Sequence, residues 1–136
     1  MRYLLDTDTP GDLMRRAPTP TLLRRLAVTP PDDQATSSIT LAELLYGAHR
    51  LAARSAGLLQ RIEEAVAAHL PVLPFDEAAA REHGRLRADL EARGIPIGEA
   101  DTQIAAIALA NDLVVVTGNV RHFERVPSLA VENWFA

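Results

Sequence analysis

The feature that most limits the fold is the alternation of short apolar runs with longer stretches of helical pattern. Residues 3–5 are Tyr-Leu-Leu and residues 113–117 are Leu-Val-Val-Val-Thr, without the polar–apolar alternation of a half-exposed strand. Such runs are typical of parallel strands that helices cover on both faces. The sequence therefore predicts a three-layer α/β domain.

The expected elements follow this alternation along the whole chain. We expect strands over residues 2–5, 34–39, 71–75, 113–117 and 129–134. Helices are expected to begin after Thr9, with Pro10 in the first turn, and to cover residues 19–27, 40–52, 55–70, 76–94 and 100–112. Because no repeat, linker or low-complexity segment interrupts the pattern, we expect a single domain over residues 1–136, a usual domain length.

The composition excludes several kinds of chemistry. All 14 basic residues are arginine, so a Walker-type phosphate loop and a Schiff-base enzyme, which both need lysine, are excluded. The chain has no cysteine, which excludes disulfides, thiol catalysis and zinc–thiolate sites and suits a cytoplasmic protein. No signal peptide or apolar run near 20 residues is present, so no membrane role is expected. The net charge of −4 argues against a general nucleic-acid coat protein, although metal ions can offset clustered carboxylates in a nuclease.

Two acidic residues stand where a parallel sheet would bind a ligand, which is beyond the carboxyl ends of its strands. Asp6 directly follows the first apolar run, and Asp8 or Thr9 lies closer to the next helix and would cap it better. Asp101 opens a helix whose apolar stripe is Ile104, Ala105 and Ala108, so its carboxylate is expected above the buried face. A favourable interaction with the helix dipole is the alternative for Asp101.

Two further candidates follow the second and fourth expected strands. Glu43 lies three residues after Thr40, which is also the spacing of a helix capping box. Asn119 lies two residues beyond the run at 113–117, in a Thr-Gly-Asn stretch that is also typical of a turn. Clustered carboxylates repel one another, and hard divalent cations such as Mg²⁺ and Mn²⁺ relieve that repulsion. Two such ions can activate water and stabilise the leaving oxygen of a phosphodiester.

These residues and their flanking segments resemble the PIN-domain ribonucleases, in particular the VapC toxins of bacterial toxin–antitoxin pairs. The matching pieces are "YLLDTD", "SSITLAELLYGAHR" and "IGEADTQIAAIALANDLVVVTGNVRHFERVPSLAVENW", in the family's order. The resemblance implies a parallel five-stranded sheet flanked by helices. It also implies an endoribonuclease that uses Mg²⁺ or Mn²⁺, a VapB-type antitoxin as partner, and a homodimer.

The resemblance also implies roles for individual residues. Asp6, Glu43 and Asp101 match the family's acidic, metal-binding positions, and Asn119 matches a fourth catalytic position that is Asp in many members and Asn in others. Asp8 stands where many relatives have Asn. Glu99 is a candidate to compensate for Asn119, and Thr117 a candidate to orient Asp6 or a metal-bound water.

Three residues are expected to bind substrate: Arg85, on the helix over 76–94, and Arg121 and His122, which follow Asn119. For Arg85 and its neighbour Arg81, ion pairs with acids on the same helix are the alternative. Three other functions stay open. They are a catalytically inert PIN-like binding scaffold, a nuclease acting on DNA, and a receiver-type domain with Asp76 as phosphoacceptor, against which the absence of lysine argues.

Overall fold

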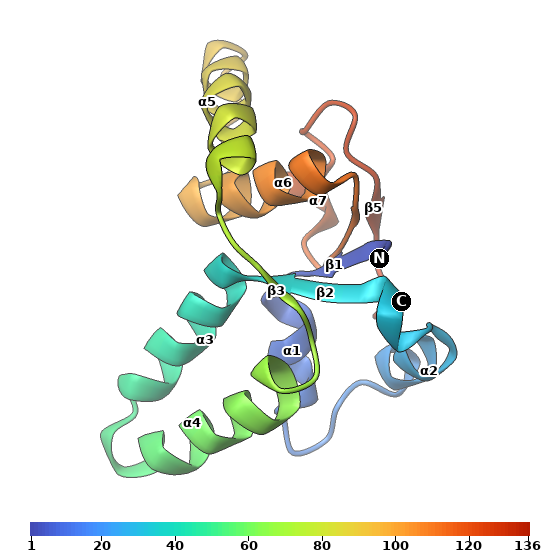
Figure 1. Ribbon diagram of the computed structural model, residues 1–136, viewed down its shortest axis with the longest axis vertical. Coiled ribbons are helices and arrows are strands. Elements are labelled where there is room, and N and C mark those ends of the chain that lie inside the picture. The colour runs from blue at the N-terminus through green and yellow to red at the C-terminus, as the bar shows by residue number, and fades with distance from the viewer.

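The computed structural model describes residues 1 to 136, and its central layer is a five-stranded sheet (Figure 1). The strands are β1 (Tyr3–Leu5), β2 (Gln34–Ser37), β3 (Val72–Leu73), β4 (Val114–Val116) and β5 (Val131–Glu132). Their order is β3-β2-β1-β4-β5, and every neighbouring pair is parallel. Because β1 lies at the centre, the residues that follow it lie in the middle of the sheet's carboxyl edge.

Helices cover both faces of this sheet, as the sequence predicts. They are α1 (Asp8–Leu13), α2 (Pro20–Val28), α3 (Ser38–His49), α4 (Ser55–Ile62), α5 (Glu77–Ala92), α6 (Glu99–Asn111) and α7 (Val120–Phe123), and a π-helical segment, Glu63–Ala67, continues α4. Figure 1 shows α5, α6 and α7 on one side of the sheet and α1, α3 and α4 on the other. The three-layer α/β expectation is confirmed.

Neighbouring residues of one strand pack against opposite helical layers. Leu4 and Val115 belong to a core cluster with residues of α5 and α6, such as Leu86 and Ile104. The next residues along, Leu5 and Val116, belong to a second cluster with Leu22, Tyr3 and Trp134. Both sides of β1 and β4 are therefore buried, which explains why these two runs are apolar at every position. Each fully buried Leu or Ile stabilises the fold by roughly 1.5–3 kcal/mol relative to exposure.

Side-chain caps define the starts of α3 and α5. The Ser37 hydroxyl accepts a hydrogen bond from the Thr40 N–H at 3.0 Å, and Asp76 accepts one from the Ala79 N–H at 3.0 Å. The alternative role of Glu43, in a capping box with Thr40, is therefore wrong. Ser37, the last residue of β2, has extended backbone and caps the helix itself, so β2 ends two residues earlier than predicted and α3 begins at Ser38.

Other boundaries differ where the sequence signal is local or weak. The first helix begins at Asp8, ahead of the expected start after Thr9. The helix expected over residues 55–70 is α-helical only to Ile62 and then becomes the π-helical segment. Helix α7 was not predicted, because four residues are too few to show helical periodicity. None of the helices combines the length and apolar character that crossing a bilayer requires.

Candidate active site

Asp6 is the centre of the acidic edge. Its backbone N–H donates to the Val116 carbonyl at 3.1 Å, which extends the pairing of β1 with β4 by one residue. The side chain is 4% exposed. One carboxylate oxygen, Oδ2, accepts from the Thr117 hydroxyl at 2.6 Å, and the other, Oδ1, accepts from the Asp8 N–H at 3.0 Å. Both oxygens are thus held by the two loops that leave β1 and β4, and the predicted orienting contact of Thr117 is confirmed.

The environment of Asp6 opposes its ionisation. The pKa of Asp6 is raised from 3.8 to about 7, chiefly by burial and also by the negative charges of Asp8 and Asp101, while the hydrogen bonds from Thr117 and the Asp8 N–H only partly counteract the rise. Near neutral pH the carboxyl is therefore about half protonated. A cation placed beside it would favour the ionised form.

Asp8 connects the same two loops from the solvent side. Its Oδ2 accepts from the Gly118 N–H at 3.1 Å and lies 3.5 Å from the Thr117 hydroxyl. A β-carbon at Gly118 would lie only 3.2 Å from this oxygen, so glycine permits the close approach. Asp8 therefore adds a second carboxylate to the edge at a fixed position.

Asp101 lies in the first turn of α6 and contacts the predicted substrate residue His122. The His122 Nδ1 lies 3.0 Å from Asp101 Oδ2 and 2.9 Å from the Asn119 side-chain nitrogen. A protonated Nδ1 donates to Asp101, whereas an unprotonated Nδ1 accepts from Asn119. The structure thus brings Asp101, Asn119 and His122 together, although they come from α6, the loop after β4, and α7.

Glu43 joins the site through Thr7, the residue after Asp6. Its Oε1 accepts from the Thr7 hydroxyl at 2.6 Å, and the side chain lies in the second turn of α3 at the protein surface. No local sequence pattern indicates Thr7, because the bond joins residues 36 positions apart. Glu43 is the sixth residue of α3, too far from the Ser37 cap to take part in a capping box, and its side chain is free to bond to Thr7.

The donors at this edge suit a hard divalent cation in charge and in atom type. Asp6, Asp8 and Asp101 offer carboxylate oxygens, and a bound cation would counteract both the burial that chiefly raises the pKa of Asp6 and the negative charges of Asp8 and Asp101. As they are placed, Asp101 bonds to His122 and Glu43 bonds to Thr7, and no three His, Asp or Glu side chains form a group able to hold an ion. These bonds use one oxygen of each carboxylate, and binding of a cation by three of the acidic side chains would require them to move closer together.

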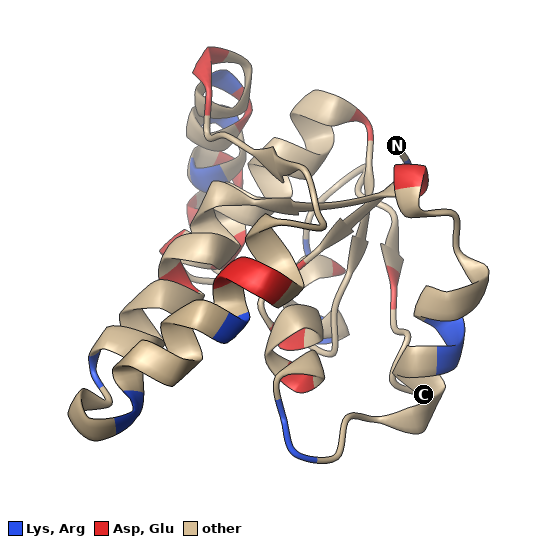
Figure 2. Ribbon diagram, turned by 60° about the horizontal axis from the view of Figure 1, so that its bottom comes forward, with Lys and Arg blue, Asp and Glu red and all other residues tan.

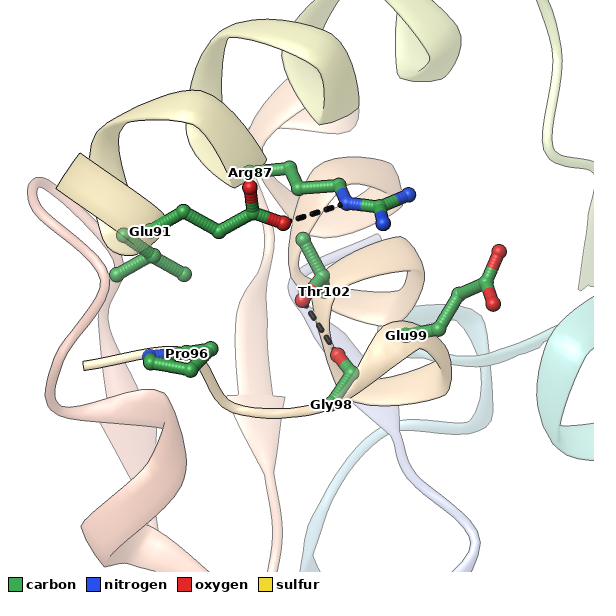
Figure 3. Close-up of a pocket in the computed structure, with 7 residues that line it drawn as sticks. Arg87, Glu91, Pro96, Gly98, Glu99 and Thr102 are labelled. Carbon is green, nitrogen blue, oxygen red and sulfur yellow. Dashed lines mark hydrogen bonds and ion pairs between the residues drawn. The ribbon is translucent and has the colours of Figure 1, made fainter. Parts of the chain in front are cut away.

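Three other candidates form no hydrogen bond or ion pair with the residues of the acidic edge. Arg85 pairs with Glu82 on its own helix, and Arg121 is exposed and forms no ion pair. Glu99 is exposed and lines a hollow of about 160 Å³ between α5 and α6, which Figure 3 shows together with Arg87. Glu91 first, and then Glu99, raises the pKa of Arg87. Glu99 thus interacts with this guanidinium, and it does not contact Asn119 as its proposed compensating role would suggest.

Helix α5 carries its arginines in local ion pairs. Arg81 pairs with Glu77 at 3.2 Å, Arg93 pairs with Asp89 at 2.8 Å, and both pairs are exposed. Acidic and basic residues occur along the length of this helix (Figure 2). The alternative proposed for Arg81 and Arg85, ion pairing on a solvated face, is therefore confirmed.

Fold and site together define a parallel α/β protein with acidic side chains at the carboxyl ends of its central strands. The PIN domain family matches residues 3–129, and the chain belongs to this family. It is 37% identical to the tRNA(fMet)-specific endonuclease VapC of Salmonella typhimurium over 98% of both chains. It is 34% identical to Ribonuclease VapC2 of Haemophilus influenzae, also over 98% of both. Among solved structures, VapBC2 of Rickettsia felis bound to a promoter DNA fragment matches with a TM-score of 0.89 and 30% identity, over 98% of this chain and 99% of that one.

Proposed function

We propose that this protein is a metal-dependent endoribonuclease toxin of a VapBC-type toxin–antitoxin pair. The observation that carries the proposal is the buried Asp6 carboxyl, whose pKa is raised to about 7 with Asp8 and Asp101 contributing their charges. Perturbed carboxyls of this kind are characteristic of catalytic sites. The ribonuclease names of relatives that match over 98% of the chain give the reaction class.

Asp6, Glu43 and Asp101 would hold Mg²⁺ or Mn²⁺, and Asn119 would complete the catalytic set. The ion, when bound, lowers the pKa of water and neutralises charge on the phosphodiester. Thr117 orients Asp6 through its 2.6 Å hydrogen bond, and His122 orients Asp101 through its 3.0 Å contact. Arg85, Arg121 and His122 remain candidates for contacts with RNA, His122 being the one that lies at the acidic edge.

The test is cleavage by the purified chain, free of any partner, of total cellular RNA and of tRNA(fMet), the RNA in the Salmonella relative's name. Reactions contain Mg²⁺, Mn²⁺ or EDTA. We expect discrete cleavage that requires metal and that Asp6→Asn and Asp101→Asn abolish. Glu77→Gln, which removes an exposed charge on α5, is the matched control and should cleave normally. Absence of cleavage by folded wild-type protein with either metal would favour an inert binding scaffold.

We further propose that an antitoxin protein covers the apolar surface between α3 and α4. A hollow of about 260 Å³ lies there, lined mainly by apolar side chains such as Leu44, Leu51 and Leu58. Leu51, which lines this hollow, is 39% exposed, and Tyr46 on α3 is 69% exposed. Exposed apolar side chains beside an apolar hollow are typical of an interaction surface. The VapBC complexes among the structures of relatives support an antitoxin as the kind of partner, and the exposed apolar hollow is what suggests this surface for it. Co-purification with a co-expressed VapB-type antitoxin would test the partner, and its loss in Leu51→Arg would test the surface.

A further inference from the structure

A hollow of about 440 Å³ borders the acidic edge and has no role in the proposed cleavage. Its lining includes Asp8, Gly118 and Asn119 at the acidic edge, together with Arg15, Thr19 and Phe135. The volume falls within the roughly 300–1,000 Å³ of ligand-binding pockets. We call this space the Arg15 hollow. Asp8 and Asn119 belong both to the acidic edge and to the lining of the hollow. A chain-like ligand held at the acidic edge would therefore continue directly into the Arg15 hollow.

Arg15 is held at the rim of the hollow by a buried carboxylate. Its Nη1 donates to Asp12 Oδ1 at 3.1 Å, and the Asp12 side chain is 6% exposed. Asp12 also accepts from the backbone N–H and the hydroxyl of Thr19, at 2.8 and 2.9 Å. Burial opposes ionisation of Asp12, but these bonds from Thr19 and Arg15 outweigh it and keep the pKa of Asp12 below its usual value.

The Arg15 guanidinium nevertheless remains open to a ligand. The side chain is 66% exposed, and only one of its five N–H donors is used within the protein. Arg15 is also the one cationic side chain that lines the hollow. A phosphate approaching the carboxylates of Asp8 and Asp12 meets repulsion, so a planar guanidinium beside them is the group that would make an anion's approach favourable.

Phe135 gives the hollow a fixed aromatic wall. Its ring packs over Gly118, since a β-carbon there would lie 3.5 Å from two ring atoms. The ring also packs against the core cluster that contains Trp134, and the Phe135 N–H donates to the Asn133 side chain at 2.8 Å. A half-buried ring fixed in this way can stack on a nucleobase without losing conformational freedom of its own.

We infer that the Arg15 hollow is a subsite for the nucleotide next to the scissile phosphodiester, whose base stacks on Phe135 and whose phosphate pairs with Arg15. The inference rests on the proposed function, because it assumes that RNA lies along the acidic edge. It assigns substrate positioning to two residues outside the set of catalytic candidates. Any base can stack on Phe135, so the subsite is expected to strengthen RNA binding and to position the RNA along the acidic edge without selecting a particular base.

The test is binding of a fluorescein-labelled single-stranded RNA dodecamer, measured by fluorescence anisotropy in EDTA so that cleavage does not occur. We expect Phe135→Leu, which keeps an apolar side chain over Gly118, to weaken binding between about 5- and 100-fold. For a dodecamer that lacks bases, Phe135→Leu should leave the Kd unchanged. Arg15→Ala should reduce the slope of log Kd against log salt concentration by about 0.7, and Arg15→Lys should preserve that slope.

Arg81→Ala is the matched control, since Arg81 is an exposed arginine in a single ion pair on α5. Thermal unfolding of every variant confirms folding, and Arg15→Ala gives an independent readout if Phe135→Leu does not fold. The inference is overturned if wild-type protein does not bind the dodecamer, or if both variants bind as Arg81→Ala does. If the wild-type protein cleaves RNA but Phe135→Leu and Arg15→Ala bind the dodecamer as the control does, only the subsite is overturned. Absent cleavage with binding that depends on Phe135 and Arg15 overturns the nuclease proposal and leaves an RNA-binding site.

Discussion

Asp6 should control how the stability of the metal-free protein depends on pH. Its pKa is about 7 in the folded protein and 3.8 ordinarily, so between these values the folded state binds more protons than the unfolded state. The free energy of unfolding must therefore fall as pH rises through this window, by up to about 4 kcal/mol in total. Urea unfolding in EDTA should show wild-type protein less stable at pH 8 than at pH 5.

The amide of Asp6→Asn does not ionise, so this substitution should remove most of that slope. At pH 8 the variant is expected to be more stable than wild-type protein, and the difference should disappear toward pH 4. Asp32→Asn, at a carboxylate outside the site, should retain the wild-type slope. Equal pH slopes for wild type and Asp6→Asn would contradict the role assigned to the buried carboxyl.

Thr117 holds two groups at once, and its hydroxyl is completely buried. It donates to Asp6 at 2.6 Å and accepts from the Asn119 N–H at 2.9 Å. Thr117→Val keeps the shape but leaves Asp6 and the Asn119 N–H without this partner, which should cost about 1–3 kcal/mol of unfolding free energy. Thr117→Ser keeps the hydroxyl and should lose less. Urea denaturation at pH 8 measures the free energy of unfolding of both variants. Equal losses would contradict a dominant role for the two hydrogen bonds of the hydroxyl.

At the scale of elements, the Ser37 cap connects the end of β2 to the helix that carries Glu43. The buried Ser37 hydroxyl accepts from the Thr40 N–H, so Ser37→Ala should lower the free energy of unfolding by about 1 kcal/mol, within the range of 0.5–2 for N-cap losses. Ser37→Asp restores an acceptor and tests whether the cap, not the residue's volume, is responsible. A Ser37→Ala protein as stable as wild type would place the start of α3 elsewhere.

The sequence predicted elements well where a signal repeats along the chain and less well where it depends on one contact. The apolar run before Asp6 and the stripe of α6 after Asp101 identified a strand end and a helix start, because burial of a whole face imposes the pattern. The capping box was misassigned because Ser37 and Thr40 are both plausible caps, and only the extended backbone of Ser37 decides between them.

The same distinction applies to the candidate site. Residues that follow strands could be placed at one edge from the topology of parallel sheets alone. The bond of Thr7 to Glu43 joins residues 36 positions apart, and the packing of Phe135 on Gly118 joins residues 17 positions apart. No local sequence pattern indicates either contact. The Arg15 hollow therefore became visible only when the loops after β1 and β4 and the C-terminal segment were seen together.

At the scale of the whole molecule, the uncovered apolar surface between α3 and α4 should determine self-association when no other protein is present. A surface with Tyr46 69% exposed and Leu51 39% exposed, next to a hollow of about 260 Å³, is more favourable when buried against a second copy. We expect light scattering after size exclusion to give twice the chain mass of 14.8 kDa. Leu51→Arg should shift the protein to one chain mass with little change in unfolding temperature, since the side chain is partly solvated already.

Val28 provides the control for that experiment. It is 77% exposed at the end of α2, and it does not line the hollow between α3 and α4. Val28→Arg introduces the same charge and should leave the dimer mass unchanged. If both substitutions dissociate the protein, added charge alone is the cause. If neither does, the copies meet through another surface, and the face between α3 and α4 is then open for the antitoxin even in the free toxin.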